Sequence, residues 1–83
     1  MAETINVIVR NKTDVLLRTE CLSVSMVNDV GPFDILPDHS NFVALIQGEV
    51  VIRESSGKTW TRSCVRGLTK VLTNLVDVVF LEE

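Results

Sequence analysis

The sequence predicts an all-β domain. Along most of the chain, apolar residues recur at every second position, which is the period of a strand with one face in the core. Short clusters of Asn, Asp, Ser and Gly separate these segments and mark turns. No segment longer than about ten residues has a convincing helical period. About eight to ten short strands with such spacing form a β-sandwich or a small barrel.

Size and composition limit what this domain can be. With 83 residues the chain makes one domain, and 46% hydrophobic residues suffice for a modest core. Aromatic residues are only 5% of the chain, so Val, Ile and Leu must fill most of the interior. The net charge is -3 and no basic cluster is apparent, which argues against a nucleic acid as the partner.

Three strands are expected in the first third of the chain. Residues 4–10 (TINVIVR) and 14–18 (DVLLR) flank the turn signal NKTD. The first of them alternates Ile5, Val7 and Val9 with polar residues. In the third, residues 21–27, alternation predicts that Leu22, Val24 and Met26 share one face and that Ser23 and Ser25 share the other.

Further strands are expected after residue 41. FVALI and EVVIRES precede the hairpin turn Ser55-Ser56-Gly57, where glycine can take the positive φ that such turns need. KTWTRSCV, GLTKVLT and LVDVVFL follow. Residues 71–79 also have apolar spacings of three and four, but their β-branched side chains and Asn74 favour two strands joined by a turn.

The segment 30–46, VGPFDILPDHSNFVALI, combines two prolines and the single histidine with apolar residues. Pro37 disfavours a helical conformation of Leu36 and removes a backbone donor, so a sheet can carry it only at an edge or a bulge. We expect a rigid, exposed turn with apolar side chains at one end of the sandwich. It is either a contact surface for another protein or an ordinary corner in which His39 caps backbone carbonyls.

Catalytic chemistry has little support. Cys21 and Cys64 lie in strand patterns without metal-ligand spacing, and we interpret both as buried free thiols. Asp34 and Asp38 flank Ile35-Leu36-Pro37, where acids more often cap a turn than transfer protons. The four glycines are too scattered for a phosphate loop. We expect no catalytic residue, metal or cofactor; a small hydrolase using Cys or His is the enzymatic alternative.

The N-terminal sequence MAETINVIVR carries an acid and no long apolar run, so we do not expect a signal peptide. No stretch approaches the roughly 20 apolar residues of a membrane-spanning helix. These features predict a soluble, cytoplasmic protein.

Two stretches resemble one known family. GPFDILPDH resembles the Gly-Glu-hydrophobic-Gly-Ile-Leu-Pro-Gly-His stretch of the epsilon subunit of F-type ATP synthases, the delta subunit in mitochondria. Residues 67–81, GLTKVLTNLVDVVFL, resemble a Gly-Phe-Leu-Glu-Val-x-x-Asn-x-Val-x-Val-Leu segment of the same family. Pro32, Asp34 and Asp38 stand where the family has Glu, Gly and Gly, and Arg66 and Lys70 stand where it has Gly and Glu.

The resemblance implies a flattened antiparallel β-sandwich over residues 1–83, without catalytic activity. In the family this domain lies at the foot of the central stalk, binds the gamma subunit and rests on the c-ring. It helps couple proton translocation to ATP synthesis. The implied partner-binding residues are Phe33, Ile35, Leu36, Pro37 and His39, together with Pro32 and Asp38. The implied location is the cytoplasmic face of the cell membrane, peripheral, with membrane association only through the complex.

Three further expectations accompany this resemblance. The family usually continues into a C-terminal pair of helices, and this sequence ends at Glu83, so we expect the helical hairpin to be absent. An apolar docking surface makes a weak homodimer of the isolated chain conceivable. The alternative to a stalk subunit is a stand-alone β-sandwich interaction module with a different partner.

Overall fold

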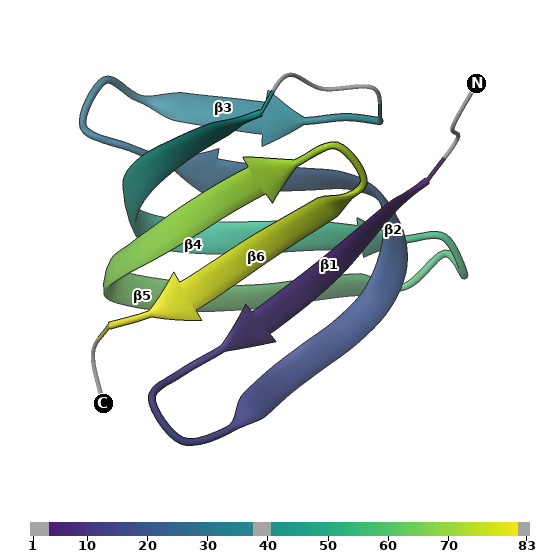
Figure 1. The fold of residues 1–83 in the computed structure, drawn as a ribbon, viewed down its shortest axis with the longest axis horizontal. Helices are drawn as coiled ribbons and strands as arrows, with labels where there is room; N and C mark the ends of the chain where they lie inside the picture. Colours follow the sequence, from purple (N-terminus) through teal and green to yellow (C-terminus); the bar gives the residue numbers. More distant parts are fainter. Residues whose placement is uncertain (1–3, 38–40, 82–83) are drawn as a thin grey trace.

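The computed structural model describes residues 4–37 and 41–81, and every regular element in these ranges is a strand (Figure 1). The expectation of an all-β domain is therefore confirmed. The strands are β1 (Ile5–Arg10), β2 (Val15–Val27), β3 (Pro32–Ile35), β4 (Phe42–Glu54), β5 (Thr59–Leu72) and β6 (Leu75–Phe80).

These strands form one sheet that closes on itself. Their order is β1-β6-β5-β4-β2-β3, and β1 also pairs with β2, so that only β3 lies outside the closed part. Every pairing is antiparallel except that of β1 with β6, which is parallel and joins the first strand to the last. Figure 1 shows β1 and β6 side by side across the front of the domain.

The strands are fewer and longer than the sequence pattern suggested. β2, β4 and β5 have 13, 13 and 14 residues, and each joins two segments that we expected as separate strands. Register shifts occur between Cys21 and Ser23 and between Ile46 and Gly48, where Gly48 has φ +83°. A bulge bends a strand without ending its pairing. Each long strand therefore continues where the pattern breaks, and six strands complete the sheet.

The shift in β2 also changes which side chains face inward. Cys21, Val24 and Met26 are buried, as is Ser23, whereas Leu22 is exposed. The expectation that Leu22 shares a face with Val24 and Met26 was wrong, because the extra residue of a bulge reverses the alternation beyond it.

The core is built almost entirely from aliphatic side chains. Fifteen buried apolar residues form one cluster, among them Ile5, Val7 and Val9 of β1 and Val50 and Ile52 of β4. Five partly buried residues pack against this cluster: Leu16, Leu17, Phe33, Phe42 and Trp60. β-branched residues suit this role because they fit the pleated surface of a sheet.

Local turn chemistry follows the sequence closely. β5 ends at Leu72 and β6 begins at Leu75, which confirms the choice of two strands over a helix. Gly57 has φ +99° in the β4–β5 hairpin, as expected for its turn. The Asn11 side-chain oxygen accepts hydrogen bonds from the backbone N–H groups of Thr13 and Asp14 at 2.9 and 2.7 Å, which fixes the turn between β1 and β2.

Thr69 of β5 is fully buried, and its hydroxyl has no hydrogen-bond partner among the described residues. Replacing it by valine of similar shape removes the unpaired polar group, so we predict that Thr69→Val raises the free energy of unfolding by about 1 kcal/mol. Urea unfolding measures this value. The exposed Thr61 of the same strand gives the control, because Thr61→Val is expected to change stability by less than about 0.5 kcal/mol. A loss of stability in Thr69→Val would show that the hydroxyl is satisfied.

Candidate functional site

The segment singled out in the sequence lies at an edge of the sheet. Within the described residues β3 pairs only with β2, in the antiparallel register Val24↔Ile35, Met26↔Phe33 and Val27↔Pro32. Pro32 is the first residue of this edge strand, a position that tolerates the loss of a backbone donor. Pro37, for which the sequence predicted an edge or a bulge, follows the end of β3 and is not part of a strand.

Two residues of this segment attach it to the body of the domain. Ile35 is completely buried in the core. The ring of Phe33 packs edge to face against Phe42 of β4, with centroids 6.1 Å apart. Ile35 thus has no surface to offer a partner in this conformation, and its role is to anchor β3.

The remaining described residues of the segment face outward to different degrees. Leu36 is 54% exposed and Pro32 is exposed, while Pro37 is partly buried. We call residues 32–37 the tip segment. The structure brings Pro32, Phe33, Ile35, Leu36 and Pro37 together there, and the other two predicted contact residues, Asp38 and His39, lie outside the described residues.

Polar side chains fix β3 from its outer side. Arg53 of β4 donates a hydrogen bond to the Ser25 hydroxyl at 2.9 Å, and this hydroxyl donates to the Asp34 carboxylate at 2.6 Å. The chain of contacts links β4, β2 and β3. Asp34 therefore holds the edge strand. The expectation that it caps a turn was wrong, because it lies within β3 and bonds across to β2.

The turn before β3 presents an aliphatic residue that sequence reasoning missed. The Asn28 side-chain oxygen accepts from the backbone N–H groups of Val30 and Gly31, and Asn28 N–H donates to Gly31 C=O. This Asx turn holds Val30 at 90% exposure. The sequence signal for this exposed valine was its position directly after the Asn28-Asp29 turn signal.

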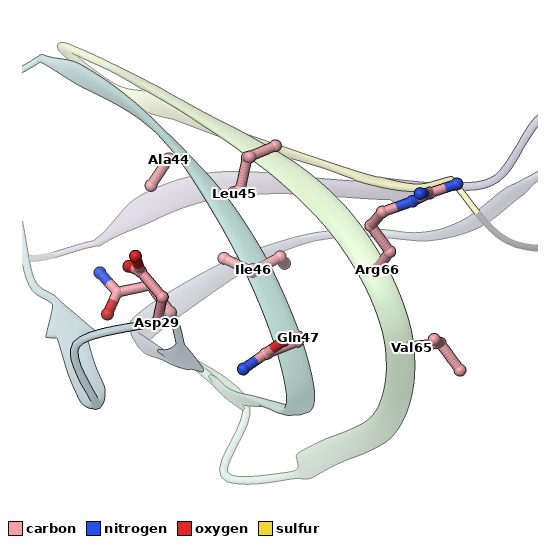
Figure 2. Close-up of a pocket in the computed structure, with 8 residues that line it drawn as sticks. Asp29, Ala44, Leu45, Ile46, Gln47, Val65 and Arg66 are labelled. Atoms are coloured by element: carbon pink, nitrogen blue, oxygen red, sulfur yellow. The ribbon is translucent and has the colours of Figure 1, made fainter.

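Beside this turn, a groove of about 580 Å³ crosses β4. Its residues come from the turn, β4 and β5: Asn28, Asp29, Ala44, Leu45, Ile46, Gln47, Val65 and Arg66. Figure 2 shows Asp29 on one side of β4, with Val65 and Arg66 on the other. The groove is open and partly apolar, which suits contact with a macromolecule.

Cys21 is not placed for nucleophilic chemistry. Cys21 and Cys64 are free and buried, as expected. Burial raises the pKa of the Cys21 thiol from 9.0 to about 11, Glu54 adds to the rise, and a backbone hydrogen bond from Ser23 opposes it. A thiol with so high a pKa is a poor nucleophile at neutral pH.

Within residues 4–37 and 41–81, no three His, Cys, Asp or Glu side chains gather as potential metal ligands. The same residues contain no helix long and apolar enough to cross a membrane.

The sequence matches no protein-family model and no curated protein. The fold, however, is similar to that of solved chains. One belongs to a structure of the Euglena gracilis mitochondrial ATP synthase containing OSCP, F1 and the c-ring. The TM-score is 0.90 at 18% sequence identity, and the match covers 99% of this chain and 53% of that chain. Another is from the central stalk and c-ring of the Tetrahymena thermophila mitochondrial ATP synthase. Its TM-score is 0.80 at 12% sequence identity, and the match covers 94% of this chain and 63% of that chain.

These likenesses establish the class of fold: a small β-domain of the kind found in mitochondrial ATP synthase assemblies. The chain spans about half to two thirds of the length of the solved chains it matches.

We predict that Cys21 resists a thiol-specific aromatic disulfide reagent at pH 8, because on the order of 0.1% of a thiol with this pKa is ionised there. The assay uses a Cys64→Ala variant, so that only Cys21 reports, and repeats the reaction in guanidinium. The folded thiol keeps its proton up to about pH 11, whereas the unfolded thiol loses it above about pH 9.0. Ionisation therefore stabilises the unfolded state in this range, and the free energy of unfolding falls as pH rises from 9.0 to about 11. Fast labelling of the folded protein would contradict the assignment.

Proposed function

We propose that this chain is a non-catalytic central-stalk subunit of a rotary F-type ATP synthase, which binds the gamma subunit and the c-ring and helps couple proton translocation to ATP synthesis. The observation that carries the proposal is the match of 99% of the chain, at TM-score 0.90, to a chain in a mitochondrial ATP synthase. The Ile35-Leu36-Pro37 motif and the segment 67–81 support the same assignment from the sequence.

The mechanical task suits this architecture. A subunit that transmits torque needs a body that does not deform and attachment points that do not shift. The closed sheet supplies the body, because each strand of its closed part pairs on both sides over at least part of its length. The tip segment is fixed to it by Ile35, by the Phe33–Phe42 contact and by the Arg53–Ser25–Asp34 contacts.

In this proposal the contact is made by the exposed part of the tip segment. Leu36, Pro32 and the accessible parts of Phe33 and Pro37 touch the partner, Ile35 supports them from the core, and Asp38 and His39 complete the surface. A proline-containing loop loses little conformational entropy on binding, because proline restricts the free chain.

The proposed location is peripheral, on a membrane that carries the enzyme, with association only through the complex. The two matched chains are from mitochondrial enzymes, whereas the sequence resemblance implied the cytoplasmic face of a cell membrane. The surface contacts proposed here are the same in either setting.

A single charge at the tip tests the contact. Leu36→Asp introduces a carboxylate that must be desolvated in the complex, so we expect binding to a gamma–c-ring subcomplex to weaken about tenfold or more. Biolayer interferometry with the immobilised subcomplex measures the affinity. Because Leu36 is largely exposed, the variant is expected to keep the fold, which circular dichroism checks.

Val15→Asp is the matched control, because Val15 is also 54% exposed but lies at the start of β2, beside the β1–β2 turn. Its affinity should equal that of the unchanged chain. Equal weakening by both variants would place the contact elsewhere. Failure of the folded, unchanged chain to bind at all would contradict the stalk assignment and favour a stand-alone interaction module with a different partner.

A further inference from the structure

The most exposed apolar side chains of the described residues gather around the groove. Val30 is 90% exposed, Val65 78% and Leu45 65%. Leu45 and Val65 line the groove, and Val30 follows Asp29 in the turn that borders it. The turn that holds Val30 precedes Pro32 at one end of β3, whereas Leu36 follows the other end of this strand. Such a concentration of exposed aliphatic groups is typical of an interaction site.

Among the described residues, one edge of β4 has no neighbouring strand beside this surface. From Val43 to Ile46 the strand pairs with β5, and its pairing with β2 involves only Val51–Glu54. Four consecutive residues of β4, Ala44–Gln47, line the groove. Because side chains alternate between the two faces of a strand, four consecutive residues reach one groove only where the strand edge itself borders it.

Charge on the turn side of the groove favours a basic occupant, because Arg66, the other charged residue of the lining, lies across β4 (Figure 2). Asp29 is exposed on the wall formed by the turn, and within the described part of the chain its carboxylate has no hydrogen bond or ion pair. The chain as a whole carries a net charge of -3. A lysine or arginine passing Asp29 would therefore be favoured over an acid.

We propose that the open edge of β4 accepts an extended strand of a partner protein, which extends the sheet beyond residues 43–47. The added strand forms main-chain hydrogen bonds to β4, places an apolar side chain against Leu45, and carries a basic residue opposite Asp29. Val30 contacts the same partner from the neighbouring turn. This surface extends from the β2–β3 turn to the edge of β4, and only the choice of gamma as the probe below rests on the proposed function.

Strand addition has a signature that side-chain docking lacks. Backbone N–H groups that enter a new ladder exchange slowly with solvent, whereas amides under a side-chain contact alone keep much of their exchange rate. Hydrogen–deuterium exchange of the folded chain, alone and with a saturating gamma subunit, resolves peptides covering β4. We expect at least a tenfold slowing for edge-facing amides within 43–47.

Each outcome of this experiment is decisive. Complex formation with slowed exchange in 43–47 supports strand addition. Complex formation with unchanged exchange there overturns it and leaves the stalk assignment intact. Absence of any complex overturns both proposals. If exchange in 43–47 slows in the absence of gamma as the concentration of this chain rises, the edge binds a second copy of the chain. That result overturns the proposed occupant.

A charge reversal tests the predicted basic residue of the partner. Asp29→Lys is expected to weaken the complex about tenfold at low ionic strength, and less at high salt, where the attraction is screened. Glu20→Lys on β2 makes the same charge change at another exposed carboxylate and should leave the affinity within twofold. Equal affinities for Asp29→Lys and the unchanged chain would overturn the assignment of a basic contact.

Discussion

The whole arrangement depends on the position of β1. This short strand pairs with β2 on one side and with β6 on the other, so it closes the sheet and joins the two ends of the chain. Three of its six residues, Ile5, Val7 and Val9, are buried. The ion pair between Arg10 of β1 and Asp77 of β6, at 2.9 Å, adds a side-chain contact between these two strands. Without β1, β6 would keep only β5 as a neighbour and much of the core would be open to water.

Closure also determines where the domain can be functional. Closure leaves few strand edges open: within the described residues, β3 pairs only with β2, residues 15–19 of β2 only with β1, residues 43–46 of β4 only with β5, and residues 59–63 of β5 only with β4. The tip segment belongs to the first of these edges and the groove borders the edge of β4. Phe33 and Phe42 connect the two edges, so both candidate surfaces are held by the same body. A domain with two fixed contact surfaces is suited to joining two partners.

Local features of the fold were predictable from the sequence, and non-local ones were not. Alternation identified Val7, Val50 and Ile52 as core residues, and Asn74 marked the turn before β6. The motif around Pro37 located an edge with an exposed leucine. However, the bends at Cys21–Ser23 and Ile46–Gly48 resemble strand ends in sequence, because a bulge and a turn use similar residues. The β1–β6 pairing and the exposure of Val65 depend on closure, which no local pattern specifies.

The central claim is that this chain is part of the rotor of an ATP synthase. The most direct test is to purify the intact enzyme from cells that produce a tagged form of this chain, with a mild detergent and the tag as the only handle, and to determine its structure by electron cryo-microscopy. The account predicts a complete enzyme with a six-stranded domain between the central stalk and the c-ring, its tip segment in contact with a neighbouring subunit. An intact ATP synthase that lacks this chain, while the tag recovers other proteins, would contradict it.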